Sequence, residues 1–362
     1  MNRLIVAFIL TFQLCVFVPV QTVAASDVGD ILIGTVIEFT ITKEYYKYMD
    51  NNMQEQYFQQ YARKYGMTNN QELNKQLFRI VNRIQQAPGN DEARKRPVQA
   101  FVNAQQSMNA FRGVGNVISL NEGLWTHLTS EDEIAFITAH EIAHGSKQHL
   151  IRNLDKIIGW TLARQIFLAK NNPTLLNQIL SWSAVNYILA KSATLPLEWE
   201  ADNAAFTYAT NAGYNPGAGA AAKAKMRAIY GDRTPNFFGE FLSPQDHPTF
   251  SQRIDNFMGK VTAYSGGAIT TEKTLLGVAV KAKGETIFVP VKAYGQLQDE
   301  RAYLIAGNLA RLCHNEGNFA TPFRVENGSV YNSFYKIVTP ADGEPDAAEA
   351  AEKLNQVFNL QL

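Results

Sequence analysis

The sequence has little cysteine and no excess of charge of either sign. Only two of its 362 residues are cysteine, so disulfides cannot be what holds a chain of this size together. The 33 basic and 33 acidic residues balance, and the chain therefore lacks the basic surplus with which nucleic-acid-binding proteins neutralise phosphates. With 46% hydrophobic residues, the composition also excludes a disordered or collagenous chain. We expect a globular protein with a large core and no nucleic-acid partner.

Clean hydrophobic runs are also scarce, and the clearest one lies at the N-terminus. Residues 1–25 combine Arg3, an apolar stretch over 4–20 and small residues at Val23–Ala25, which is typical of a cleaved secretory signal peptide. An uncleaved anchor is the alternative, because the apolar stretch is close to the length of a membrane span. Cleavage leaves Cys313 as the one thiol, so no disulfide forms within the chain. Export without internal disulfides leads us to predict a periplasmic protein.

Two further apolar stretches lie at about residues 157–170 and 175–191. Polar residues such as Arg164 and Asn177 interrupt them, and neither reaches the uninterrupted length of a membrane-spanning helix. A buried or hairpin pair of helices is the favoured interpretation, and peripheral association with a membrane stays open.

The pattern of the chain changes at a glycine-containing segment. Before it, residues 26–262 have mainly helical periodicity, with an amphipathic helix near 77–84 and a capping box that starts a helix at Ser130. We predict a linker over residues 263–271 and a small C-terminal α/β domain over residues 272–362. The expected elements are strands at about 98–103, 111–120, 275–280 and 286–293, helices at 130–149, 196–211, 300–314 and 346–358, and a hairpin over 323–335 that turns at Asn327–Gly328.

The strongest chemical signal is His140-Glu141-Ile142-Ala143-His144, inside the capped helix. Residues four apart on a helix differ by only about 40° in direction, so His140 and His144 project from one face and can bind one metal ion. Imidazole nitrogens suit Zn²⁺, and Glu141 can take a proton from a water beside the ion. The pattern therefore predicts one zinc ion per chain.

A hydrolytic zinc site needs a third protein ligand, which this helix does not supply. Leu150 stands where some related sites have a third histidine, and His149 lies about 180° from His140 on a continuous helix, so it should point elsewhere. Glu198 and Asp202 are again four residues apart on a second predicted helix. One carboxylate can bind the zinc while the other accepts the N–H of a liganding imidazole, whereas Glu200 should miss the metal.

These motifs resemble those of the gluzincin endopeptidases of family M48, which are related to the CAAX prenyl protease and to bacterial HtpX and BepA. The resemblance covers about residues 70–260. The matching segments are Asn109–Phe111, His140–His144, Glu198–Asp202, Asp246–Thr249 and the Arg253-Ile254 pair. The resemblance implies a fold of the α+β class. In this fold a mainly helical metalloprotease domain over residues 26–262 has a small β-sheet edge beside the active-site helix.

The resemblance also implies roles for single residues. His140, His144 and Glu198 would bind the zinc, Glu141 would be the general base, and Asp202 would be the carboxylate behind a ligand. The region after residue 271 does not resemble the helical TPR repeats of some periplasmic relatives, so their partners do not transfer.

Two residues outside the central motifs have alternative roles. The family places the loop of His247 near the metal, where this histidine could be structural, donate to the oxyanion, or occupy the open coordination position in a latent state. Arg253 could form an ion pair with a carboxylate, which is the favoured role, or stabilise charge in the transition state.

A strand beside the active-site helix is expected to hold the substrate. An extended peptide would add to the edge of the strand at 111–120 through main-chain hydrogen bonds, a mode that selects unfolded segments. The predicted substrate-binding residues are Gly113, Val114, Gly115, Asn116 and Val117.

Together these patterns predict an exported zinc endopeptidase that cleaves misfolded or unassembled envelope proteins. The alternative is a chaperone-like or assembly factor whose peptidase site is normally occluded. A true prenyl-protein protease would need several membrane-spanning helices, which the sequence does not contain.

Overall fold

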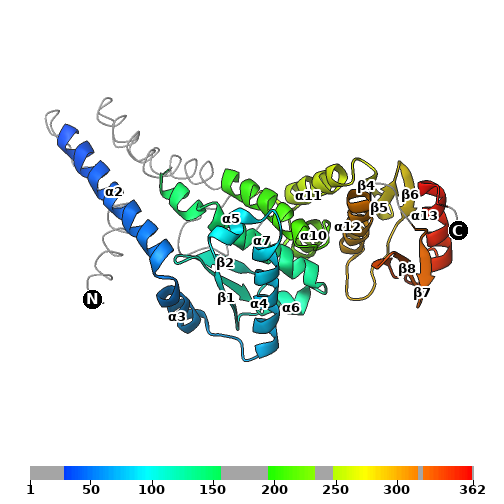
Figure 1. Cartoon of the computed structure of the whole chain (residues 1–362), viewed down its shortest axis with the longest axis horizontal. Helices are drawn as coiled ribbons and strands as arrows, with labels where there is room; N and C mark the ends of the chain where they lie inside the picture. The colour runs from blue at the N-terminus through cyan, green and yellow to red at the C-terminus, as the bar shows by residue number, and fades with distance from the viewer. Residues whose placement is uncertain (1–27, 156–194, 233–247, 317–320, 361–362) are drawn as a thin grey trace.

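The computed structural model describes residues 28–155, 195–232, 248–316 and 321–360. These residues form a mixed α+β protein that runs from α2 at one end, through a central group of helices around a small sheet, to two small sheets at the other end (Figure 1). The predicted signal peptide and the predicted helices at 157–170 and 175–191 lie outside the described residues. In the parts of the chain that are described, no helix has both the length and the apolar composition needed to cross a bilayer.

Among the described residues, four helices precede the first sheet, and the amphipathic one carries the predicted stripe. Leu77, Ile80, Val81 and Ile84 are all buried, as their three- and four-residue spacing requires, so this prediction is confirmed. The four helices are α2 (Val28–Asn52), α3 (Gln54–Tyr65), α4 (Gln71–Gln86) and α5 (Asp91–Lys95).

The first sheet has three strands in the order β1-β3-β2. Strand β3 pairs with β1 in parallel and with β2 in antiparallel, so it is the central strand. The single strand predicted over residues 111–120 is wrong, because Gly115 and Asn116 both have left-handed backbone angles and reverse the chain there. The strands are β1 (Gln99–Asn103), β2 (Ala110–Gly113) and β3 (Val117–Asn121).

The helix with the two histidines, α7 (Glu131–Ser146), follows the short helix α6 (Gly123–His127). Its predicted capping box is confirmed, since Ser130 and Glu133 satisfy each other's backbone N–H groups. At its other end, Gly145 packs against the β2–β3 turn, where an added Cβ would lie 2.2 Å from Oδ1 of Asn116. The helix is therefore held close to the sheet beside β2.

An alanine-rich helix joins the two ends of the molecule. Helix α10 (Ala218–Tyr230) packs against α7, α11 (Phe250–Tyr264) and α12 (Gln298–Glu316). Small side chains allow this close packing, and Gly219 lies directly against the ring of Phe136. The helix at residues 195–211, predicted from Pro196, is confirmed.

The described residues of the C-terminal region form two antiparallel three-stranded sheets that pack with α12 and α13. The hairpin at Asn327–Gly328 and the last helix are confirmed, with both turn residues in the left-handed region. The predicted strand at 275–280 begins too early, because Leu275 and Leu276 form the turn between two strands. The elements are β4 (Ile269–Thr274), β5 (Gly277–Ala282), β6 (Glu285–Phe288), β7 (Arg324–Glu326), β8 (Ser329–Asn332), β9 (Tyr335–Val338) and α13 (Ala347–Phe358).

A buried acidic pair lies where α7 meets α12. Glu133 and Glu300 are both fully buried, with Lys225 3.3 Å from Glu300. Burial, together with the charge of Glu300, holds the pKa of Glu133 well above its ordinary value. Glu133 is therefore protonated in the folded protein at pH values where it is ionised in the unfolded chain.

We expect Glu133→Gln to stabilise the protein at neutral and alkaline pH. A raised pKa in the folded state gives stability that is complete below the unfolded pKa of about 4.3 and is lost as pH rises through the folded pKa. Glutamine keeps the capping box but has no proton to lose, so the gain grows with pH toward about 1–3 kcal/mol, a typical penalty for an unsatisfied buried group. Urea unfolding of both proteins between pH 4 and 9 measures this gain in the free energy of unfolding. Glu131→Gln on the same helix turn is the control. A gain in stability from Glu133→Gln that is equal at all pH values would contradict the raised pKa of Glu133.

Candidate metal centre

Three side chains from two helices converge on one point. His140 and His144 of α7 face each other with their Nε2 atoms 3.1 Å apart. Glu198, on the helix at residues 195–211, places Oε2 3.5 Å from Nε2 of His140 and Oε1 3.3 Å from Nε2 of His144. In the described part of the chain, these three residues form the one group of histidine, cysteine and acidic side chains compact enough to hold a metal ion.

The spacing of these atoms fits a zinc ion. Bonds of about 2.0–2.1 Å at tetrahedral angles separate ligand atoms by about 3.3 Å, which is close to the three distances in this group. Two imidazole nitrogens that face each other can share a proton, or both can direct a lone pair to one metal ion. Two histidines and one glutamate are a donor set of hydrolytic zinc sites, which keep the fourth position open. The group can therefore hold the metal in the way that the sequence predicts.

A buried ion pair lies behind His140. Oδ1 of Asp202 is 3.0 Å from Nδ1 of His140, and Asp202 is wholly buried. Arg253 of α11 donates to both oxygens of this carboxylate, with Nε 2.7 Å from Oδ2. Of the two carboxylates, Glu198 thus lies beside the Nε2 atoms of both histidines, whereas Asp202 lies on the Nδ1 side of His140. Arg253 forms an ion pair with Asp202.

The electrostatics of the group favour a cation. Burial alone would lower the pKa of His140, but hydrogen bonding and charge from Asp202 and Glu198 outweigh it and raise the pKa to about 9. Burial would raise the pKa of Asp202, but the charge of Arg253 and the contact with His140 lower it to about 2. Asp202 is therefore ionised throughout the neutral range, and the negative charge that attracts a proton to His140 would equally attract a metal ion.

Glu141 lies between the two histidines in sequence and is also buried, with 5% of its surface exposed. A carboxylate in this position can exchange a proton with a water molecule close to the metal. His247 lies outside the described residues; the described helix α11 begins just after it, capped by Thr249.

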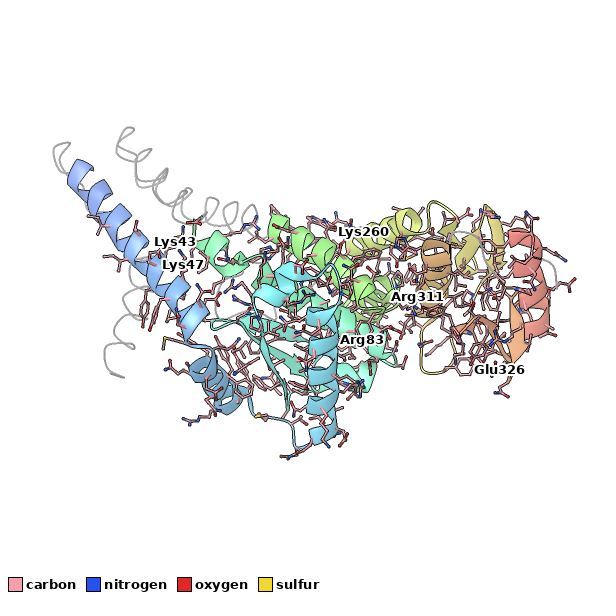
Figure 2. All side chains as sticks on the ribbon, in the orientation of Figure 1. Lys43, Lys47, Arg83, Lys260, Arg311 and Glu326 are labelled. Carbon is pink, nitrogen blue, oxygen red and sulfur yellow. The ribbon has the colours of Figure 1, made fainter. Side chains whose placement is uncertain are left out.

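Helix α4 contacts the end of the helix that supplies Glu198 and Asp202. Arg83 (labelled in Figure 2) donates from Nε to the carbonyl of Ala212 at 2.7 Å, and its guanidinium lies 4.2 Å from the ring centre of Tyr214. These contacts fix the C-terminal end of residues 195–211. Helix α4 therefore anchors the C-terminal end of the helix that carries Glu198.

The predicted substrate strand needs correction. Val117 belongs to the central strand, so β1 and β2 already use its main chain. The N–H groups of Val114 and Asn116 donate to Tyr61 and Asp50, at 3.0 and 3.3 Å. The prediction that Val114, Gly115, Asn116 and Val117 form a free strand edge is therefore wrong. Among the described strands of this sheet, the outer side of β2, which ends at Gly113, is the edge beside α7.

Two buried residues of the site were not predicted. His149 does not point away, since its Nδ1 lies 2.9 Å from Nδ1 of His144. Burial and the neighbouring charges of His144 and Arg152 lower its pKa to about 2. Lys223 of α10 is buried, and burial together with the charge of Arg253 lowers its pKa to about 8 despite the nearby acids. A lysine within an alanine-rich helix was the sequence signal for the second residue.

A helix that carries two histidines one turn apart, completed by a glutamate from a later helix, is the arrangement of the gluzincin class of metallopeptidases. The chain belongs to peptidase family M48, whose family model matches residues 71–260, more than half of its length. Over 147 residues it is 30% identical to a protein of Vibrio cholerae serotype O1 named "Putative beta-barrel assembly-enhancing protease". The match covers 40% of this chain and 28% of that protein, so the chain matches little more than a quarter of the relative's length.

Proposed function

We propose that the protein is an exported, periplasmic zinc endopeptidase that cleaves misfolded or unassembled envelope proteins. The observation that carries this proposal is the convergence of His140, His144 and Glu198 beside the buried Glu141. Membership of family M48 supports the peptidase activity. The name of the Vibrio cholerae relative, which refers to the assembly of beta-barrel proteins, supports a substrate in the envelope.

The residues around the site have separate tasks in this reaction. When bound, a zinc ion polarises the scissile carbonyl and lowers the pKa of a water ligand toward about 7. Glu141 accepts a proton from the attacking water and passes it to the leaving amine. Asp202 holds Nδ1 of His140, so the lone pair of Nε2 points into the site, and Arg253 balances the charge of Asp202.

The outer edge of β2 is the proposed substrate site. This strand lies against α7, and an extended peptide can add to its edge through main-chain hydrogen bonds. A folded protein cannot present an extended strand there, so the site selects unfolded or unassembled chains. Because main-chain contacts depend little on side chains, we expect broad sequence specificity.

A second candidate function is binding of unassembled proteins without cleavage. It is favoured by apolar side chains that are exposed at turns of the C-terminal sheets, namely Leu275, Leu276 and Phe334. Such side chains can contact unfolded polypeptides. The two functions differ in whether they need Glu141.

Unfolded casein tests the proposed activity. We expect the purified protein to cleave casein between about pH 6 and 9, to lose this activity with a zinc chelator and to regain it when zinc is added back. A compact folded protein of similar size, incubated in parallel, should stay intact. No cleavage of casein with zinc present at any of these pH values would contradict the proposal, and cleavage that survives the chelator would contradict the metal.

A further inference from the structure

The second metal-binding histidine has an imidazole behind it instead of a carboxylate. Nδ1 of His149 lies 2.9 Å from Nδ1 of His144, and the two rings are nearly perpendicular, at 82°. His149 is 4% exposed, so water does not compete freely for this contact. A distance of 2.9 Å between two ring nitrogens is a hydrogen bond in which one ring donates and the other accepts.

A break in the helix brings His149 to this position. Helix α7 ends at Ser146, and Gln148 takes a left-handed backbone angle of 53° before residues 149–155 resume a helix. On an uninterrupted helix His149 would lie on the side opposite His140. The left-handed residue instead turns the chain back, so that the imidazole reaches the rear of His144. A non-glycine residue in this conformation is uncommon and is kept only when the surrounding structure holds it.

The direction of the hydrogen bond follows from the chemistry of the site. His144 presents Nε2 to Glu198 and His140, so a metal bound there takes the lone pair of Nε2 and the proton of His144 stays on Nδ1. That N–H donates to Nδ1 of His149, whose own proton must then be on Nε2. Nε2 of His149 lies 3.5 Å from Oε2 of Glu200, and Arg152 holds the same oxygen at 2.7 Å. Among the described residues Nε2 of His149 has no hydrogen-bond partner, and its N–H lies on the side of the Glu200 carboxylate.

We propose that His149 is a positioning residue for His144: it accepts the Nδ1–H of His144, and so holds the tautomer and ring orientation that direct Nε2 to the metal. This inference rests on the metal site of the proposed function. Asp202 does the same for His140, so each histidine of the site is supported from behind. The two supports differ in charge, because Asp202 is an anion and the buried imidazole is neutral. His149 therefore orients its ligand without adding negative charge to the site.

Three substitutions separate positioning from packing. Asparagine places an oxygen near the position of Nδ1 and can accept from His144, whereas glutamine places its oxygen near Nε2, on the side of Glu200. Leucine fills the space but accepts no hydrogen bond. We expect His149→Leu and His149→Gln to bind zinc about 10- to 100-fold more weakly, as losses behind a ligand usually do, and His149→Asn to stay close to the unsubstituted protein. His127→Leu, at a histidine on α6, is the matched control.

The measurements do not depend on catalysis. Competition with a chromophoric chelator gives the zinc affinity, and the visible absorption of the cobalt-substituted protein reports the geometry of the ligands. We expect the leucine and glutamine variants to change the cobalt spectrum and asparagine to restore it. The inference would be overturned if His149→Asn bound zinc as weakly as His149→Gln, or if His149→Leu had unchanged zinc affinity and an unchanged cobalt spectrum. If leucine prevents folding, the comparison of the two amides still decides. An unsubstituted protein that binds no metal would instead refute the proposed function.

Discussion

Replacing Glu141 by glutamine should remove cleavage of casein and leave one metal ion bound per chain. The substitution keeps the size and polarity of a buried side chain that is not among the three converging ligands. Glutamine cannot accept a proton from water, and a positioned general base contributes about 10²- to 10⁴-fold to such reactions. Initial rates on labelled casein and metal content of the same sample measure both quantities. Among the substitutions considered that leave the metal bound, this one should have the largest effect on activity.

A control on the same helix makes this result specific. Glu131 is partly exposed in the first turn of α7 and pairs with Arg79, so Glu131→Gln should leave the rate unchanged. Cleavage by Glu141→Gln at the unsubstituted rate would refute the role of Glu141. The same variant also separates the two candidate functions in cells. Loss of function there favours hydrolysis, whereas full function favours binding without cleavage.

Asp202→Ala should destabilise the protein and weaken its zinc binding together. Arg253 is 3% exposed and donates to both oxygens of Asp202, so removal of the carboxylate leaves a buried guanidinium without its main partner. Breaking such a pair typically costs about 3–5 kcal/mol. His140 also loses the contact at Nδ1, which should lower zinc affinity about 10- to 100-fold. Urea unfolding in a chelator measures the first effect and chelator competition measures the second.

A double substitution separates these two effects of Asp202. Asp202→Ala combined with Arg253→Met removes the unpaired charge, so we expect most of the stability to return while zinc binding stays weak. His140→Ala is the reference for loss of a ligand and should abolish stoichiometric zinc. Unchanged zinc affinity in Asp202→Ala would show that this carboxylate does not support His140. A double variant that is no more stable than the single one would show that the buried charge is not the cause of the instability.

The parts of the site that follow from local geometry could be predicted from the sequence. The spacing of His140 and His144 requires one helix face, and the capping box at Ser130 indicates where that helix begins. The same helical spacing relates Glu198 to Asp202. The family resemblance then assigned the two carboxylates, and the structure places Glu198 at the histidine Nε2 atoms and Asp202 behind His140.

The errors arose where the chain reverses direction. The β2–β3 turn was taken for continuous strand, because the strand propensity of Val117, Ile118 and Leu120 was weighted above the turn preference of Gly115 and Asn116, which both adopt left-handed angles. The position of His149 was wrong for a different reason, since Gln148 is not a residue that usually ends a helix in this conformation. At Gln148 packing around the turn, and not the preference of the turn residue, decides the backbone.

The sequence by itself determined the metal-binding helix, its cap, the helical spacing of the two acids and the kind of ion they suit, because an α-helix fixes the relation between residues three or four apart. Only the tertiary structure decided that Arg253 pairs with Asp202, that Lys223 is buried near the site, and that His149 supports His144. These contacts join residues from different helices or across a helix break. Their geometry depends on how whole elements pack, which no local pattern of side chains specifies.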